Sequence, residues 1–343
     1  MLTTILSGGL IGLIFGFILQ RTRFCLTGGF RDMYIARNNT LFYAFLIAIT
    51  VESIGVLSLI KLGIIGNPYE EFSVLGAIVG SYLFGIGIVL AGGCATGTWY
   101  RAGEGLLGSG VALFFYMTSA AAMKSGFLVP LNQLIAKRWV INDDLAGQLG
   151  IPVWYFLVFL VAITSFIVIR ELRKPRRQIA TLPSKYKGVR HYLFEKTYHK
   201  YFAGFLIGLV AFIAWPASQL TGRVGGLGIT TPSAHLISYI ITGDSKQLGW
   251  GVFLVLGIFL GSFLAAKGSR EFRWRLPDLS TIGKSTLGGM FMGIGASWAG
   301  GCTIGNGLTA TAIFSSKGWI ALPVTILGVW TASYIIFVKP NKN

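Results

Sequence analysis

Two of the three cysteines lie in glycine-rich segments that resemble each other closely although they are far apart in the chain. The first segment runs from Gly85 to Gly97 around Cys94, and the second runs from Gly293 to Gly305 around Cys302. In both, the dipeptide Gly-Gly comes directly before the thiol, and glycines let a backbone leave a helix and approach a ligand closely. The spacing therefore predicts one kind of thiol site, built twice.

Each thiol is expected at a break between two helical pieces, where the second piece directs its N–H groups and the positive end of its dipole at the gap. Such a gap favours an anion. The alternative is that the glycines only allow close helix packing, but packing gives no reason for a thiol at the same place twice. The residues expected to bind an anion through backbone or hydroxyl groups are Gly92, Gly93, Thr96, Gly97, Gly300, Gly301, Thr303 and Gly305.

The third cysteine, Cys25, has no counterpart in the second half of the chain. A lone thiol is most often a small buried side chain. However, Cys25 follows Arg21 and Arg23, two cations that could attract an anion toward it. Both interpretations stay open at this point, and the pair of arginines is predicted as an anion-attracting element.

Other kinds of site are not expected. The chain has no Cys-x-x-Cys motif and no cluster of Cys with His, so neither a metal nor a disulfide is predicted. The glycine-rich segment from Gly222 to Gly228 lacks the lysine of a phosphate-binding loop and is better explained as a tight turn. We therefore predict no cofactor and no catalytic residues, which means that the protein is not expected to be an enzyme. Glu52 and Glu104 lie in apolar sequence, where acids are functional candidates as proton carriers or partners of an arginine.

The composition predicts an integral membrane protein. Hydrophobic residues make up 53% of the 343 residues, charged residues only 12%, and the mean hydropathy is +0.68. Soluble domains contain roughly 25% charged residues. Long apolar stretches recur along the chain, several of them close to the roughly 20 residues of a spanning helix. The expected fold is all-α, with about nine transmembrane helices and several short re-entrant helices. The apolar stretches are 4–19, 41–60, 73–91, 106–123, 153–169, 201–215, 248–266, 285–299 and 319–338.

The net charge of +17 indicates orientation and not a nucleic-acid partner, because the basic residues are concentrated in a few connections. Segments 21–37, 170–200 and 267–284 hold four, ten and five Lys or Arg, which is nineteen of the 29. By the positive-inside rule these segments face the cytoplasm.

The basic segment also divides the chain into two similar halves. We expect a first membrane repeat over 1–170, a cytoplasmic linker over 171–200 and a second repeat over 201–343. With the orientation above, the helix at 4–19 runs inward and its counterpart at 201–215 runs outward. The repeats are therefore predicted to be inverted, related by a pseudo-two-fold axis, with a site near the membrane centre between them.

The segment Gln20-Arg-Thr-Arg-Phe-Cys25, with the two Gly-Gly-Cys-x-x-Gly segments, resembles the YeeE/YedE family of bacterial inner-membrane sulfur-transport proteins over nearly the whole chain. The resemblance implies thiosulfate uptake into the cytoplasm, with the ion passed along reduced thiols in the order Cys94, Cys25, Cys302. It also implies a separate small sulfur-carrier protein of the SirA/TusA kind as partner. A permease for another sulfur or selenium species is one alternative. A membrane thiol oxidoreductase is a weaker one, because no redox cofactor motif accompanies the thiols.

Overall fold

The computed structural model of the chain describes residues 1–173, 188–196 and 198–342, and it is predominantly helical in these ranges. The first half contains a two-stranded antiparallel ribbon in which β1 pairs with β2. Its elements are α1 (Leu2–Thr22), α2 (Leu26–Ile35), α3 (Thr40–Lys61), β1 (Glu71–Ser73), α4 (Val74–Leu90), α5 (Ala95–Gly103), α6 (Leu107–Ser125), α7 (Val129–Ala136), β2 (Val140–Asn142), α8 (Leu145–Leu149) and α9 (Val153–Leu172).

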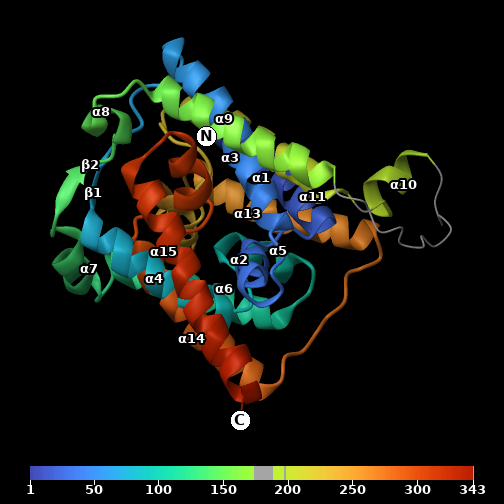
Figure 1. Cartoon of the computed structure of the whole chain (residues 1–343). Helices are drawn as coiled ribbons and strands as arrows, with labels where there is room; N and C mark the ends of the chain where they lie inside the picture. Colours follow the sequence, from blue (N-terminus) through green and yellow to red (C-terminus); the bar gives the residue numbers. More distant parts are fainter. Residues whose placement is uncertain (174–187, 197, 343) are drawn as a thin grey trace.

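The second half repeats the pattern of long helices interrupted by short ones. A short helix α10 stands apart from the helical body in Figure 1, and two π-helical segments, η2 and η3, lie near the C-terminus. The elements are α10 (Val189–Phe194), α11 (Lys200–Gln219), α12 (Thr230–Thr242), η1 (Ser245–Gln247), α13 (Trp250–Gly268), α14 (Leu279–Trp298), η2 (Gly305–Ala310), α15 (Ser316–Ser333), η3 (Tyr334–Val338) and η4 (Lys339–Lys342).

The prediction of an all-α membrane fold is confirmed, although the number of spans differs from the expected nine. Among the described residues, seven helical segments are long and apolar enough to cross a membrane, and the pair α6–α7, bent by 72°, makes an eighth. Helix α14 has 20 residues but is rich in Gly and Ser, and it does not reach the same hydropathy. It packs instead between α4 and α6. A helix shielded by its neighbours does not need an apolar surface all round.

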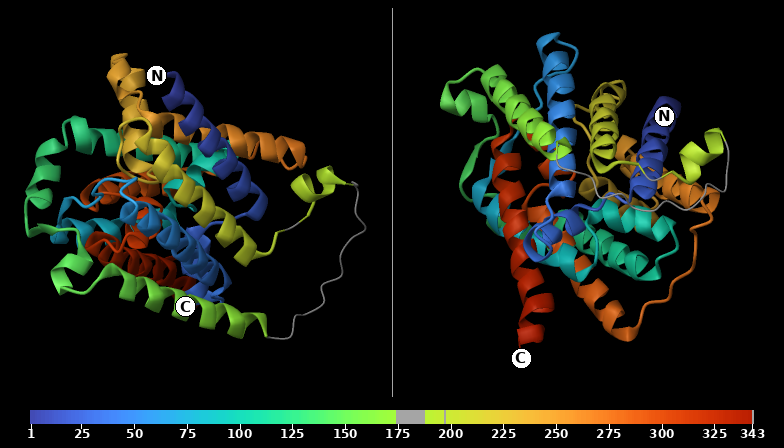
Figure 2. Two further views of the ribbon diagram at one scale, coloured as in Figure 1. Left: turned by 90° about the horizontal axis from the view of Figure 1, so that it is seen from above. Right: turned by 45° about the vertical axis from the view of Figure 1, so that its right-hand side comes forward.

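The helix contacts fall into matched pairs. Helix α1 packs along α13, and α11 packs along α3 in the same way. Likewise α6 packs on α14 while α15 packs on α4, and α12 contacts α6 while α2 contacts α15. Exchanging α1, α2, α3, α4 and α6 with α11, α12, α13, α14 and α15 therefore leaves the set of contacts unchanged. In Figures 1 and 2 the two halves interleave and do not form separate bodies.

Small residues set the spacing at these crossings. A Cβ atom on Gly12 of α1 would lie 2.1 Å from the carbonyl oxygen of Leu254 in α13, and one on Gly204 of α11 would lie 2.1 Å from that of Ala44 in α3. Where α4 crosses α14, a Cβ on Gly288 would lie 2.3 Å from the Ala91 nitrogen. Only glycine permits these approaches. The packing interpretation of the glycines is thus correct for the long helices, where close contact lets backbones meet.

Candidate functional site

The break between α4 and α5 places Cys94 inside the protein. Helix α4 ends at Leu90, and the chain turns at Gly92, whose φ of +68° lies in the left-handed region that favours glycine. Cys94 then caps the N-terminus of α5, where its Sγ accepts a hydrogen bond from the Gly97 N–H at 3.4 Å. The thiol residue is 3% exposed. The turn and the cap together fix the sulfur at the start of a half-helix, as the sequence predicts.

Cys302 lies in a matching break after α14. The turn here is at Gly300, with φ +70°, and the following helical segment η2 begins at Gly305 as a π-helix. The Cys302 thiol faces the backbone N–H groups of Ile304 and Gly305. The amide nitrogen of Asn306 donates to the Ala299 carbonyl at 2.8 Å and closes the turn. π-Helical turns are rare and often lie at functional positions.

Cys25 joins the other two thiols. It is the N-cap of α2, directly after a turn in which Arg23 has φ +49°, and it is 7% exposed. Cys94 lies within electrostatic range of both Cys25 and Cys302. The structure therefore brings together three cysteines from three distant parts of the chain. All three are free thiols.

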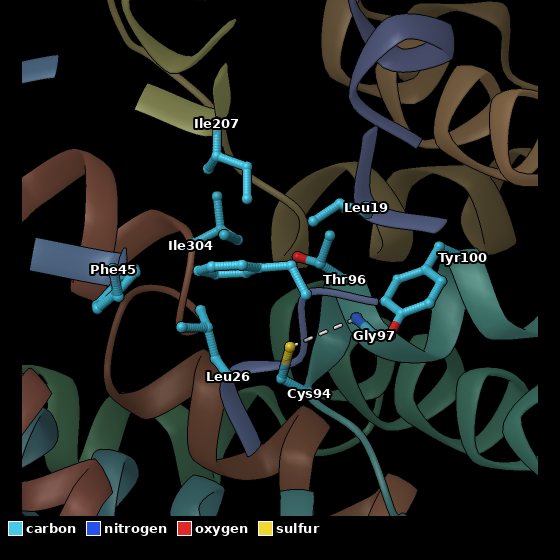
Figure 3. Close-up of a pocket in the computed structure, with 10 residues that line it drawn as sticks. Leu19, Leu26, Phe45, Cys94, Thr96, Gly97, Tyr100, Ile207 and Ile304 are labelled. Atoms are coloured by element: carbon cyan, nitrogen blue, oxygen red, sulfur yellow. Dashed lines mark hydrogen bonds between the residues drawn. The ribbon is translucent and has the colours of Figure 1, made fainter. Parts of the chain in front are cut away.

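A small internal cavity lies at this junction. Figure 3 shows Cys94, Thr96 and Tyr100 on one side of it and Leu26, Phe45 and Ile304 around the rest. The flanking residues of all three thiols contribute, because Leu26 follows Cys25 and Ile304 comes shortly after Cys302. The cavity has a volume of about 10 Å³. This is the room that a single water molecule needs, so the junction is closed to a larger ion in this conformation.

Beside each thiol lies a buried threonine hydroxyl with no hydrogen-bond partner among the described residues. These are Thr27, Thr96 and Thr303. Their residues are 5%, 2% and 4% exposed. Buried hydroxyls are nearly always hydrogen-bonded, and an unpaired one costs about 1–3 kcal/mol. Each of the three cysteines is thus followed, within two residues, by a buried hydroxyl that has a donor to offer. Thr96 and Thr303 were predicted, whereas Thr27 was missed although it repeats the Cys-x-Thr spacing of residues 94 to 96.

Two tyrosines complete the junction. The Tyr116 hydroxyl from α6 donates to Thr230 Oγ1 of α12 at 2.9 Å, and Tyr116 lies within electrostatic range of Cys302 and Cys94. Tyr100 of α5 is in the same relation to Cys25. Neither tyrosine could be identified from the sequence, because their partners come from other helices.

Arg21 and Arg23, which are predicted to attract an anion, both lie beside an acidic residue. Both guanidinium groups lie close to the Glu271 carboxylate, at 3.5 Å and 3.1 Å. Arg21 also donates to the Leu193 carbonyl at 3.0 Å. Their charge is thus partly neutralised by an acid from the second half of the chain, and attraction of an anion by these two residues stays a prediction.

Arg101 is a cation that sequence analysis did not single out as part of the site. Its guanidinium donates to the Gly92 carbonyl and to the Tyr100 hydroxyl, the latter at 3.4 Å. It also lies within electrostatic range of Cys25 and Cys94. Among the described residues it forms no close ion pair, although Glu104 lies within electrostatic range of it. Arg101 is therefore the charged group associated most closely with the thiols.

The two glycine turns have different surroundings. Gly92 and Arg101 border a cleft of about 260 Å³ together with Arg275 from the basic segment 267–284. We call this cleft the Gly92 mouth. At the other turn, a Cβ on Gly300 would lie 4.0 Å from Lys317 Nζ, and this ammonium group is 3.7 Å from the Asp143 carboxylate. Near one turn lies Arg101, within electrostatic range of Glu104, and near the other lies Lys317, paired with Asp143.

No group of three or more potential metal ligands of the His, Cys, Asp or Glu type occurs in the described part of the chain. The site's polar groups are instead thiols, hydroxyls, backbone N–H groups and one guanidinium. These groups can hold an anion with a polarisable sulfur and several oxygens.

Comparison with known proteins agrees with this chemistry. A family model described as "Sulphur transport" matches residues 21–331. The chain is 53% identical over 343 residues, all of this chain and 97% of the relative, to a protein of Escherichia coli K12 named thiosulfate transporter TsuA. It is 33% identical over 345 residues, 96% of this chain and 98% of the relative, to a protein of the same name in Spirochaeta thermophila. A probable transporter YedE of E. coli K12 is 43% identical over 96 residues, 28% of this chain and 23% of that protein.

Proposed function

The chain belongs to the sulphur transport family, and from this premise we propose that it carries thiosulfate across the bacterial inner membrane into the cytoplasm through the three-thiol junction. Relatives that match its full length are named as transporters, so the protein is a multi-pass membrane transport protein and not an enzyme. Thiosulfate, the inward direction and the thiol route are the proposed parts.

The observation that carries the proposal is the set of unpaired hydroxyls beside the thiols. Thiosulfate is a dianion with one soft terminal sulfur and three oxygens. The thiols of Cys25, Cys94 and Cys302 offer weak S–H donors for the sulfur. The hydroxyls of Thr27, Thr96 and Thr303 offer O–H donors for the oxygens. A ligand of this shape satisfies groups that the protein alone leaves unpaired.

The thiols are proposed to act in their neutral form, with no covalent intermediate. Conduction requires sites that bind well enough to admit an ion and weakly enough to release it. Three weak sites in sequence meet this condition better than one site with a fixed charge. The half-helix starts at Gly97 and Gly305 add backbone N–H groups near Cys94 and Cys302 without adding a full charge.

Passage requires the junction to widen, since the cavity holds only about one water molecule. The two glycine turns are proposed to move, because in each of them one side chain adds to the backbone hydrogen bonds a contact that can be exchanged. Arg101 binds the Gly92 carbonyl, and Asn306 binds the Ala299 and Gly301 carbonyls. An anion that attracts the Arg101 guanidinium would loosen the first turn. We propose that this exchange opens the site at the Gly92 mouth.

The structure makes two sequence expectations incompatible. The Gly92 mouth includes Arg275, so if the basic segments face the cytoplasm, Cys94 lies toward the cytoplasmic side and not where uptake begins. An order from Cys94 to Cys302 instead requires this mouth to face outward. An impermeant thiol reagent applied to intact cells decides between them. The three native cysteines are first replaced by alanine, and a single reporter cysteine is then added. The reagent should label Arg275→Cys if the Gly92 mouth faces outward, and Asp144→Cys, beside Asp143 at the other turn, if the mouth faces the cytoplasm.

We further propose that the two halves, 1–170 and 201–343, are repeats of one unit joined by the basic linker. The matched helix contacts support this, because two copies related by a two-fold axis must repeat each contact. In this arrangement Cys94 and Cys302 are equivalent and Cys25 belongs to one copy only. A small carrier protein of the SirA/TusA kind is the proposed cytoplasmic partner, which would receive sulfur after transport.

Uptake of labelled thiosulfate in a bacterial strain without its own sulfate and thiosulfate importers tests the function. The wild-type chain should restore uptake and growth on thiosulfate, and each single Cys→Ala variant should abolish both while reaching the membrane in normal amount. Competition by unlabelled sulfite, sulfate and selenium compounds defines the selectivity. Wild-type uptake by a triple Cys→Ala variant would exclude the thiol route. Coexpression of the carrier protein should raise the sustained rate if it is the partner.

A further inference from the structure

Glu52 is a fully buried acid in the middle of α3, outside the thiol junction. Its residue is 0% exposed. Its Oε1 accepts a hydrogen bond from the Trp215 Nε1–H at 2.9 Å, across to α11. Its Oε2 is buried and has no hydrogen-bond partner among the described residues. An acid in this setting is a candidate functional group, because burial of an unpaired polar atom is costly in a membrane protein.

The groups around Glu52 are neutral. Helix α11 contributes Trp215 and η2 contributes Thr309, whose hydroxyl lies close to the carboxyl group. From the loop before α12, a Cβ on Gly226 would touch the Trp215 indole and the Thr309 methyl group. No charged side chain from α2, α9, α11 or η2 acts on Glu52. Arg223, in the same loop, directs its guanidinium to the Gly226 carbonyl and over the Trp250 ring.

A carboxylate without a cation in such a place is unfavourable, whereas a protonated carboxyl is well suited to it. The carbonyl oxygen accepts from Trp215, and the hydroxyl supplies a donor that a carboxylate lacks. The group can therefore hold a proton inside the membrane. It can also lose the proton when the surroundings open to water, which is how intramembrane acids act in proton relays.

Glu52 is connected to the substrate path through η2. The π-helix η2 (Gly305–Ala310) starts three residues after Cys302 and includes Thr309. Thr309 also donates to the Leu227 carbonyl at 3.1 Å, in the loop that leads to Thr230 beside Cys302. Movement of the Cys302 turn must therefore move the surroundings of Glu52. The matching helix in the other half, α13, contains no Asp or Glu, so packing of this kind of helix does not require the acid.

We propose that Glu52 is a proton-binding site that couples thiosulfate uptake to the entry of one proton, an inference that rests on the proposed function. The Oε2–H bond forms when the site is open to the outside and breaks when it is open to the cytoplasm. Each cycle then moves one proton and one dianion inward. The net charge moved falls from two negative charges to one.

This coupling has a clear physical benefit. At equilibrium, an inside-negative membrane potential of ordinary size lowers the inside-to-outside concentration ratio of a dianion by roughly three orders of magnitude. For an ion with a single negative charge, it lowers this ratio by about one and a half orders of magnitude. One proton per ion therefore halves the electrical work of accumulation, which raises the concentration ratio that can be reached by more than tenfold. The outside of the inner membrane is also the more acidic side, so the proton moves down its gradient.

Purified protein in liposomes tests the proposal. A pH-sensitive dye is enclosed in the lumen, labelled thiosulfate is added outside, and the dye signal and the flux are measured together. Wild-type protein should acidify the lumen in step with thiosulfate flux. Glu52→Gln keeps the oxygen that accepts from Trp215 but cannot cycle a proton. In this variant the acidification per thiosulfate ion should fall at least tenfold. Downhill thiosulfate flux should continue, and the purified protein should elute in the normal position of the folded protein.

Glu104→Gln is the matched control, because Glu104 is the other buried acid of the apolar sequence and should leave the proton signal unchanged. Thiosulfate flux in the wild type without acidification would overturn proton coupling and leave the proposed function intact. Equal acidification by the wild type and Glu52→Gln would overturn the assignment to Glu52. If Glu52→Gln does not fold, Glu52→Asp is tested instead, because it retains a titratable group. This variant should still acidify the lumen, and loss of its acidification would count against the proposal. No thiosulfate flux in the wild type would instead contradict the proposed function.

Discussion

Replacing Thr96 by valine should make the protein more stable and a poorer transporter. The Thr96 hydroxyl is buried and unpaired, and valine has nearly the same shape without the polar group. Relief of an unpaired buried hydroxyl is worth about 1–3 kcal/mol, so the free energy of unfolding should rise by about 1 kcal/mol or more. In the loaded site the same hydroxyl is proposed to donate to a thiosulfate oxygen. A hydrogen bond to a charged group contributes about 1.5–3 kcal/mol, which corresponds to a loss of roughly 10- to 150-fold in apparent affinity.

Two measurements check this prediction. Uptake of labelled thiosulfate over a range of concentrations gives the apparent affinity, and thermal unfolding of the purified protein in detergent gives the stability. Thr98→Val is the matched control in the same helix. The Thr98 hydroxyl is buried but donates to the Ala95 carbonyl at 2.7 Å. Its loss should lower stability by about 1 kcal/mol and leave the affinity unchanged.

Thr96→Val is expected to raise stability and to lower thiosulfate affinity, and a general loss of folded protein cannot produce both effects. A purely structural threonine would lose stability on substitution, as expected for Thr98, and would affect uptake only through the amount of folded protein. If Thr96→Val unfolds at a lower temperature than the wild type, or takes up thiosulfate with wild-type affinity, the assignment of the unpaired hydroxyls to the ion is wrong. Thr96→Ser should keep most of the affinity, because it retains the donor.

Three further changes test other parts of the structure. Arg101→Gln should lower uptake at limiting thiosulfate by about tenfold and weaken its dependence on ionic strength, measured as initial rates over a salt series, because one of the two cations of the Gly92 mouth is lost while Arg275 remains. Gly288→Ala places a Cβ 2.3 Å from a backbone nitrogen of α4 and should destabilise the protein by 2 kcal/mol or more, about the range for overpacking, whereas Gly283→Ala, with nothing within 4 Å, should be neutral or slightly stabilising in thermal unfolding. Burial raises the pKa of Asp143 despite the nearby Lys317, so the folded state holds this proton more tightly than the unfolded one. Stability should therefore be highest at low pH and fall as pH rises from about 4 through the raised value, and Asp143→Asn should lack this loss when melting temperatures are compared across pH.

The sequence predicts the membrane class and the glycine turns because these depend on local chemistry, whereas only the family resemblance implied that Cys25 joins the other two thiols. Two Gly-Gly-Cys segments at equivalent places are enough to predict one kind of break, and both turns indeed have a glycine with positive φ, Gly92 and Gly300. The close helix crossings follow from the same residue type. What is near in the chain, or repeated in it, can be predicted without coordinates.

The partners of charged and hydroxyl groups could not be predicted, because they come from distant segments. Glu271 lies 250 residues from Arg21, and Thr230 lies 114 residues from Tyr116. Likewise, the sequence gives no reason to join Arg101 to the first glycine turn, yet its guanidinium donates to the Gly92 carbonyl. The seven or eight long apolar helices of the described residues are close to the predicted number of about nine. A helix such as α14 is recognised as apolar or not from its own residues, but its neighbours decide how much of it meets lipid.

The differences between the two halves matter as much as their likeness. Two identical inverted copies would present the same site from both faces, with equal barriers in both directions. Here one glycine turn is held by a cation, Arg101, and the other by a neutral amide, Asn306. Cys25 and Glu52 also occur in one half only. In the proposed arrangement of two inverted repeats, such groups would give the two ends of the path different electrostatic surroundings. The opening of one end could then be linked to a proton while the opening of the other is not, and the two ends would open in turn.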